Sequence, residues 1–376
     1  MGMKEARLYK PGLPAMPAGA QTKPGKRCVS TIAWLPKAYF NRVETIISAK
    51  ANSSPKGRFA NDSSALLGIP SIYTRGERLP TGPLQRAQLP VMLRCEVTMS
   101  APTAYEVVAF NTAASSDNNI HDDSIARQFG FRGALVPGVE VYAYMAHMPV
   151  ARWRRHWLES GQMECRFQKP VYDGAVTHVT AKEEHNQLEL CVESAGERCA
   201  TGRAFIPTER RLAPSVDALP ASSPPSSRPT ASEASLAPGR ALGIKPSTID
   251  RAMLSRYLEE IRETDLIYLT EGLVHPGQVL RLANAALVQN VVLGPWIHVG
   301  SKVRHHAAAR IGQELTLRSK ITSNIVSKGH AIVEFDALVI ADGKACAAEI
   351  THVAIWRPRQ ISEGSHAVNG SRPADV

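Results

Sequence analysis

The stretch GALVPGVEVYAYMAHMPV, residues 133–150, decides how the rest of the sequence is interpreted. A turn rich in glycine and proline opens into a run in which nearly every residue is apolar. A short helix that is apolar on nearly every side belongs in a protein core, because an amphipathic surface helix would keep one polar face. The stretch therefore predicts a central helix that is buried by the segments that follow it.

The segments that follow have the pattern of strands. RFQKPVYDGAVTHVTAKEE (166–184) and QLELCVESAGERCATGRAFI (187–206) alternate apolar and polar residues and contain turn residues between the alternating runs. Such alternation is typical of an antiparallel sheet with one exposed face. The fold class predicted for this block is α+β, with a curved antiparallel sheet wrapped around a central helix.

The same order of features occurs a second time. EGLVHPGQVLRLANAALVQNVVL (271–293) again combines a turn with an apolar helix. Strand-like patterns follow in VGSKVRHHAAARIGQELTLRSKITSN (299–324) and HAIVEFDALVIADGKACAAEITHVAIW (330–356). A repeated order of elements indicates two copies of one structural unit.

Composition divides the chain into five parts. Residues 1–98 are rich in Pro, Gly, Ser and basic side chains, and we expect an upstream extension of a protein that functionally begins near Met92 or Met99. Pro, Ala and Ser dominate residues 207–240, as in a linker. The predicted order is a disordered leader (1–98), an N-terminal domain (99–206), a linker (207–240), a C-terminal domain (241–358) and a disordered tail (359–376).

The distribution of charge and cysteine excludes several classes of protein. Residues 1–98 carry 15 Lys and Arg against 5 Asp and Glu, which accounts for the whole net charge of +10. The predicted domains are therefore balanced in charge and lack the basic face that a nucleic-acid-binding core requires. The sequence contains no run of 18 apolar residues, so no membrane-spanning helix is predicted. The six cysteines do not have the spacing of a metal site, so we expect none. Reduced thiols in a cytoplasmic protein fit this distribution best.

A polar segment lies directly before the first helix. It reads SDNNIHDDSIARQFGFRG, residues 116–133, and combines Asn118, Ile120 and His121 with an Ala-Arg helix and a Gly-Phe pair. This order resembles the MaoC-like branch of the hotdog fold, the (R)-specific enoyl-CoA hydratases and acyl dehydratases. Their signature has the form Asp-x-Asn-Pro-(Ile/Leu/Val)-His, with Asp and His as the catalytic pair.

Two positions of that signature differ here. Asn119 stands at the proline position and Ser116 at the aspartate position, with Asp117 one residue out of register. The tandem arrangement resembles double-hotdog proteins, in which the two halves pair like a dimer and one half often loses its site. The second block has no Asn-x-Ile-His equivalent, in agreement with that pattern.

The resemblance implies an acyl-thioester hydratase or dehydratase. Its substrates are 2-enoyl or 3-hydroxyacyl thioesters of coenzyme A or of an acyl-carrier protein, as in fatty acid or polyketide metabolism. It implies no metal or redox cofactor and a pseudo-dimer within one chain, with a homodimer of whole chains left open.

Candidate residues for this chemistry come from both blocks. We expect His121 to act as acid or base, since its ordinary pKa lies near neutrality, and Asp117 or Asn118 to orient the water. The backbone N–H groups at the start of the helix favour negative charge on a thioester oxygen. The substrate-binding residues predicted from the two turns are Gly133, Val136, Gly138, His275 and Gly277.

Other interpretations remain open for several acidic residues. Asp122 and Asp123 are expected to cap a helix, as Asp117 and Asn118 also would on composition alone. Glu140 is a carboxylate in an otherwise apolar helix, so it either contacts the helix dipole or faces a ligand. Some hotdog thioesterases resemble the second case, which makes a thioesterase using Glu140 or Asp117 the alternative enzyme. Outside enzymes, the alternative is a non-catalytic subunit that binds acyl thioesters.

Overall fold

The computed structural model describes residues 103–114, 116, 118–209 and 211–359. The predicted leader, nearly all of the predicted tail and Asp117 lie outside the described residues. The boundaries predicted for these two terminal parts therefore stay predictions.

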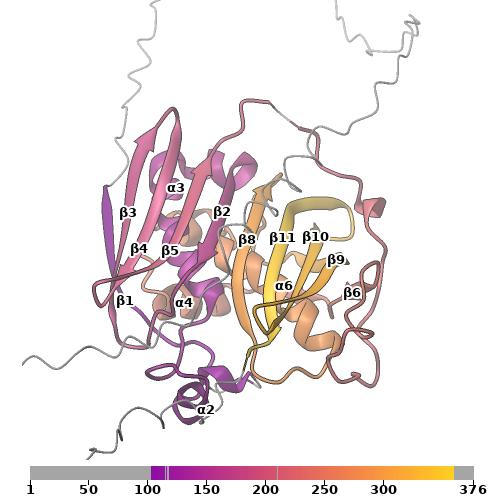
Figure 1. Cartoon of the computed structure of the whole chain (residues 1–376). Coiled ribbons are helices and arrows are strands. Elements are labelled where there is room, and N and C mark those ends of the chain that lie inside the picture. Colours follow the sequence, from indigo (N-terminus) through magenta and orange to yellow (C-terminus); the bar gives the residue numbers. More distant parts are fainter. Residues whose placement is uncertain (1–102, 115, 117, 210, 360–376) are drawn as a thin grey trace, which may run out of the picture. The chain divides into compact units, whose positions relative to one another are not determined.

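The first half combines a short helical segment, one long helix and five strands (Figure 1). Its sheet has the strand order β1-β3-β4-β5-β2, and all of its pairs are antiparallel. The elements in chain order are β1 (Ala104–Val108), η1 (Asn119–His121), α2 (Asp123–Gln128), α3 (Gly138–Ser160), β2 (Gln162–Phe167), β3 (Val176–Glu184), β4 (Gln187–Ser194) and β5 (Glu197–Phe205).

The second half repeats the long helix and the sheet and adds two helices before them. Its strands have the order β8-β11-β10-β9-β6, and the short β7 also pairs with β9. Its elements are η2 (Val216–Ala218), β6 (Ala241–Gly243), β7 (Ser247–Thr248), α4 (Arg251–Glu260), α5 (Ile267–Glu271), α6 (Pro276–Asn290), β8 (Ile297–His305), β9 (Glu314–Ser327), β10 (His330–Ala341) and β11 (Ala345–Arg357).

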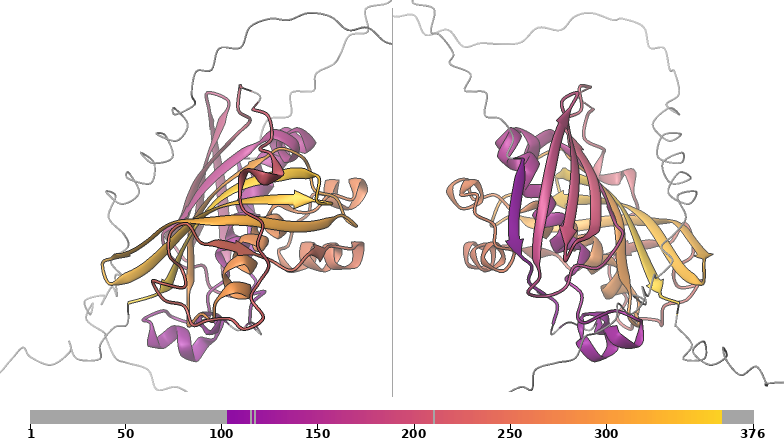
Figure 2. Two further views of the ribbon diagram at one scale, coloured as in Figure 1. Left: turned by 90° about the vertical axis from the view of Figure 1, so that its right-hand side faces the viewer. Right: turned by 60° about the vertical axis from the view of Figure 1, so that its left-hand side comes forward.

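The two halves join along one pair of strands. β2 and β8 pair antiparallel from Gln162↔Arg304 to Arg166↔Gly300, which makes one continuous sheet of 11 strands in the described part of the chain. The long helices α3 and α6 lie on the same side of this sheet (Figures 1 and 2). The predicted α+β fold, a tandem hotdog with two curved sheets each wrapped around a helix, is confirmed.

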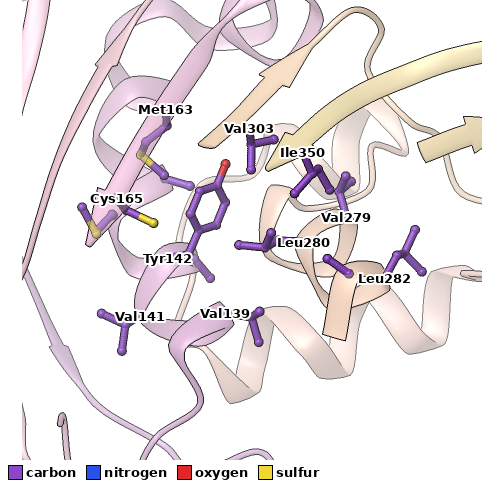
Figure 3. Packing of buried hydrophobic residues seen from close by; sticks show 14 of the residues in the cluster. Val139, Val141, Tyr142, Met163, Cys165, Val279, Leu280, Leu282, Val303 and Ile350 are labelled. Carbon is purple, nitrogen blue, oxygen red and sulfur yellow. The ribbon is translucent and has the colours of Figure 1, made fainter. Parts of the chain in front are cut away.

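The helix α3 is a core helix, as its sequence predicts. Tyr142, Met145 and Met148 are completely buried, and Figure 3 shows Tyr142 between Met163 of β2 and Leu280 of α6. The helix extends beyond the apolar stretch 133–150 that predicts it, with 23 residues to Ser160 across a kink at Arg154. Because Tyr142 contacts residues of β2 and of α6, the apolar side chains of α3 pack against both halves.

The predicted linker is irregular but packed. Its described part forms no helix or strand longer than three residues. Leu236 is nonetheless completely buried, and Asn324 of β9 donates a hydrogen bond to its carbonyl at 3.1 Å. The segment thus packs on the core of the second half while it connects the two halves of the sheet.

Candidate active site

The loop that precedes α3 is held by its acidic residues. Asp122 is the N-cap of α2 and accepts hydrogen bonds from the backbone N–H groups of Ser124 and Ile125 at 2.9 and 3.1 Å. Asp123 accepts one from the Ala134 N–H at 2.6 Å. The prediction of a helix cap is confirmed for Asp122, whereas Asp123 lies in the first turn of α2 and holds the loop at Ala134 instead of capping the helix.

His121 is held in one tautomer. Its Nδ1 lies 2.6 Å from the carbonyl oxygen of Leu135 and must donate to it, because a carbonyl only accepts. Nε2 is then the acceptor, at 3.2 Å from the side-chain amide nitrogen of Asn118. Burial lowers the pKa of His121 below its ordinary value, so the ring is neutral at pH 7 and Nε2 can take up a proton.

Asn118 ties this histidine to the second half of the chain. Its amide donates to the backbone carbonyl of Trp296 at 3.0 Å and accepts from the Trp296 N–H at 3.2 Å. The side chain is almost completely buried. A two-point contact of this kind fixes the orientation of the amide, and with it the position of the His121 ring.

The N-terminus of α3 has no side-chain cap. Pro137 is the N-cap residue, and its carbonyl accepts from the N–H groups of Glu140 and Val141. Among the described residues no acceptor serves the N–H of Gly138 or of Val139. The first amides of a helix carry partial positive charge, and their free N–H groups attract an anionic or carbonyl oxygen.

Close contacts explain the two glycines of this turn. A Cβ atom at Gly138 would lie 2.9 Å from Nδ1 of His298, and one at Gly133 would lie 2.9 Å from a carboxylate oxygen of Asp123. Val136 is buried, and its N–H donates to the Val171 carbonyl at 2.9 Å. The space beside Gly133 is thus filled by Asp123, whereas Gly138 lies at the open helix end.

Glu140 is buried in a network that joins the two halves. Its carboxylate accepts from the guanidinium of Arg281 at 2.6 and 2.8 Å, from the Thr112 hydroxyl at 2.9 Å and from the Tyr257 hydroxyl at 2.9 Å. Only 1% of Glu140 is exposed. A carboxylate with both oxygens engaged is held as a structural partner, so the geometry favours this role over the predicted attack on a thioester.

The equivalent end of α6 is closed by its own residues. His275 is completely buried, and its Nδ1 accepts from the Gly277 N–H at 3.0 Å, while the Gln278 side chain accepts from the His275 N–H. A Cβ at Gly277 would lie 2.1 Å from the Tyr257 hydroxyl, so this glycine is required by packing. The contacts of His275 and Gly277 favour a capping role over the predicted substrate binding.

Sequence reasoning missed the contribution of β8 to this site. Trp296 and His298 belong to the second half, yet they contact Asn118 and Gly138 of the first half. The only signal in the sequence was a histidine within an apolar, strand-like run. Its partner at Gly138 is 160 positions away and is reached through the pairing of β2 with β8.

Among the described residues, no group of three or more His, Cys, Asp or Glu side chains is arranged to hold a metal ion. No helix in the described part of the chain has the length and hydropathy to cross a bilayer.

Comparisons with known proteins concern the fold of the chain and not its activity. Neither a protein-family model nor a curated protein matches the sequence. Among solved structures, a conserved hypothetical protein from Mycobacterium tuberculosis with a double hotdog fold is 16% identical, covers 68% of this chain and 96% of its own, and has a TM-score of 0.46. A MaoC-like dehydratase is 16% identical, with 69% and 98% covered and a TM-score of 0.43.

A third structure is the tesB protein of Mycobacterium avium subspecies paratuberculosis. It is 11% identical, covers 68% of this chain and 93% of its own, and has a TM-score of 0.37. These likenesses concern the course of the backbone, so the activity has to be argued from the side chains described above. In fold, the chain is similar to MaoC-like and double-hotdog proteins.

Proposed function

We propose that the chain catalyses the reversible hydration of 2-enoyl thioesters to 3-hydroxyacyl thioesters. The substrate is an acyl-CoA or an acyl-carrier protein. One observation carries the proposal: the uncapped N-terminus of α3 closely follows Leu135, whose carbonyl holds a neutral histidine with its Nε2 as an acceptor. The first feature suits a carbonyl oxygen that gains negative charge, and the second suits a group that moves a proton.

The backbone at Gly138 and Val139 supplies the electrostatic part of the reaction. Addition of water to a conjugated thioester pushes electrons onto the carbonyl oxygen, which becomes enolate-like. Two free N–H groups at a helix N-terminus stabilise such an oxygen more than they stabilise the ground-state carbonyl. Preorganised donors of this kind need no reorientation during the reaction.

His121 supplies the proton transfers. Its Nε2 accepts a proton from water while the water oxygen bonds to the β-carbon of the enoyl group. The resulting imidazolium returns that proton to the α-carbon, so the sum of both steps is the addition of one water molecule. The carbonyl of Leu135, which accepts from Nδ1 at 2.6 Å, stabilises the charged ring in between. These transfers need neither a metal ion nor a redox cofactor.

Asn118 keeps the histidine in place until the substrate binds. Its amide is anchored on the backbone of Trp296, and the same amide nitrogen reaches Nε2 of His121. In the proposed complex the reacting water takes over the contact with Nε2. Asp117 is proposed to orient that water in the absence of the signature aspartate, whose position is occupied by the exposed Ser116.

Incubation with crotonyl-CoA tests the proposal against its two alternatives. We expect enoyl absorbance to fall without release of free thiol. Release of thiol at the rate of substrate loss would identify a thioesterase instead. If neither signal changes while acyl-CoA still raises the unfolding temperature, the chain is a non-catalytic acyl-thioester-binding protein.

A further inference from the structure

His298 is a buried histidine with one unused ring nitrogen at the N-terminus of α3. It lies on β8, only 5% of it is exposed, and its Nδ1 has no hydrogen-bond partner among the described residues. A Cβ at Gly138 would lie 2.9 Å from this nitrogen, so the nitrogen faces the uncapped end of the helix. Buried polar atoms without a partner are rare in native proteins, which points to a ligand group at this place.

The contacts of the other ring nitrogen decide which role Nδ1 can take. Nε2 lies 3.2 Å from the carbonyl oxygen of Gly300 and 2.8 Å from the hydroxyl of Ser301. A carbonyl oxygen only accepts, so Nε2 carries the hydrogen of the neutral ring. Burial lowers the pKa of His298 to about 3. The ring is therefore neutral near pH 7, and Nδ1 is an acceptor.

Neighbouring side chains hold the ring in this orientation. It stacks on His352 with 4.1 Å between the ring centroids, and Phe167 packs edge-on against it at 4.8 Å. The hydroxyl of Ser301, which contacts Nε2, also lies 3.0 Å from Nδ1 of His352. The packing thus keeps the acceptor nitrogen of His298 at the helix end.

The end of α3 offers two kinds of unpaired group beside each other. Among the described residues, the N–H groups of Gly138 and Val139 lack an acceptor, whereas Nδ1 of His298 lacks a donor. A thioester carbonyl oxygen can satisfy only the N–H groups, because it has no hydrogen to donate. Nδ1 requires a second group on the ligand, and a hydroxyl group has the hydrogen that it needs.

A 3-hydroxyacyl thioester carries both groups within three carbon atoms. Its carbonyl carbon and its hydroxyl-bearing carbon are separated only by the α-carbon, so the two oxygen atoms can lie side by side. We infer that Nδ1 of His298 accepts a hydrogen bond from the 3-hydroxyl group of a thioester whose carbonyl oxygen is bound by the N–H groups of α3. The inference rests on the proposed function and assigns recognition of the hydroxyl group to the second half of the chain.

The same contact applies to the water that adds to the enoyl thioester. One hydrogen of that water passes to Nε2 of His121, and the other stays on the oxygen and becomes the hydrogen of the 3-hydroxyl group. His298 accepts a hydrogen bond from the hydrogen that stays, so it touches the substrate without moving a proton. Asp117, which is also proposed to orient this water, is the competing acceptor, and the experiment separates the two.

The experiment measures how much the 3-hydroxyl group strengthens binding. Calorimetry gives the ratio of the Kd of butyryl-CoA to the Kd of each enantiomer of 3-hydroxybutyryl-CoA, which differs from butyryl-CoA only in the hydroxyl group. Every protein also carries His121→Gln, so that the proposed dehydration cannot proceed. We expect one enantiomer to bind about 10-fold more tightly than butyryl-CoA, the usual effect of one buried hydrogen bond.

Substitutions of His298 remove or replace the acceptor at the position of Nδ1. His298→Phe removes it, and the ratio should fall to about 1 because no hydrogen bond remains. His298→Asn keeps an amide oxygen near Nδ1 and should retain much of the ratio, whereas His298→Gln places its amide near Nε2 and should not. Ser301→Ala should not change the ratio, since the Gly300 carbonyl still fixes the tautomer. His305→Phe replaces another buried histidine of β8 and is the matched control.

Three results would overturn the inference. The first is a ratio of about 1 in the protein with His298 intact, which would show that the hydroxyl group gains nothing from the site. The second is a ratio that falls in Asp117→Asn but not in folded His298→Phe. If the phenylalanine variant does not fold, the third is an equal ratio in His298→Asn and His298→Gln.

Hydration of crotonyl-CoA by the chain with His121 intact separates this inference from the proposed function. Hydration without a ratio that depends on His298 would overturn the inference and leave the hydratase standing. A ratio that depends on His298 in a chain that never hydrates the substrate would support the contact with the hydroxyl group and overturn the hydratase. Binding of neither ligand, as a coenzyme A or as a carrier-protein thioester, would overturn both.

Discussion

The N-termini of α3 and α6 occupy the same place in the two halves but end in opposite ways. The α3 terminus has a proline N-cap without a side-chain hydrogen bond, whereas the α6 terminus is closed by a capping box of His275 and Gln278. Among the described residues, one helix end leaves its first N–H groups without an acceptor, where we propose that a ligand binds, and the other satisfies them internally. A repeated fold can therefore confine its binding site to one half through a single capping residue.

The closed end has a buried carboxylate beside it, as the open end has in Glu140. Glu263 lies between His147 of α3, at 2.8 Å, and His275, at 3.6 Å. Burial would raise the pKa of Glu263, but the hydrogen bond from His147 and the nearby ring of His275 hold it below its ordinary value. Together with the pair of Glu140 and Arg281, this network joins α3 to the second half, so the acidic groups between the helices serve assembly.

The largest effect is expected at the open end. His121→Ala should lower kcat for hydration by about 100- to 10,000-fold, the usual contribution of one acid–base group, with little change in unfolding temperature. His275→Ala is the matched control at the closed end and should retain hydration. Steady-state rates with crotonyl-CoA check both variants, and equal activity of wild type and His121→Ala would refute the site assignment.

The next largest effect should be on stability, when the guanidinium of Arg281 between the two halves is removed. Arg281→Met leaves the Glu140 carboxylate buried without its charged partner, which typically costs about 3–5 kcal/mol. Urea unfolding should show this loss in the free energy of unfolding. The double variant Glu140→Gln with Arg281→Met removes the unpaired charge and should recover part of the stability. A thioesterase that depends on Glu140 would instead lose hydrolysis in Glu140→Gln alone.

Acid should destabilise the chain through the buried histidines of the second half. Burial lowers the pKa of His298 to about 3 and that of His305 to about 4. The unfolded chain binds protons at these groups near pH 6.5, whereas the folded chain does not, so stability is complete above that pH and falls as pH drops toward 4. Each histidine contributes up to about 1.4 kcal/mol per pH unit in this window.

Urea midpoints measured between pH 7 and pH 4.5 check this slope. His305→Phe removes one of the two groups and should make the pH dependence shallower. A midpoint that stays constant over the whole range would contradict the burial of neutral histidines in the folded chain.

The smallest effect is expected from the cap itself. The lost cap in His275→Ala should cost about 1 kcal/mol, and because His275 is completely buried, the cavity left by the ring adds to that cost. His275→Asn retains a good N-cap residue and should lose less. Thermal unfolding of the two variants measures the difference, and an alanine variant as stable as wild type would show that the cap does not stabilise the helix end.

Local patterns predict the elements of this fold well. The apolar runs around Tyr142 and Leu280 identify both core helices, because their composition already requires burial on every side. The alternating strands follow from the same argument. The length of α3 beyond Arg154 and the packing of Leu236 were not predictable, since both depend on surfaces that the other half supplies.

The site was predictable only in part. His121 and Asn118 stand out because several residue types recur in a short, ordered motif. The contact of His298 with Gly138 and the partners of Glu140 arise between the halves, and no local pattern records which residues will meet there. The sequence predicts Gly138 as a substrate-binding residue, whereas its close contact with His298 can be seen only in the folded structure.

A crystal structure of the His121→Gln variant with bound crotonyl-CoA would test the comparison of the two helix ends most directly. We predict one thioester per chain, with its carbonyl oxygen within hydrogen-bond distance of the Gly138 or Val139 N–H and the α6 end still capped by His275. A thioester bound at the N-terminus of α6, or a helix α3 end that stays empty while the ligand binds elsewhere, would contradict the account.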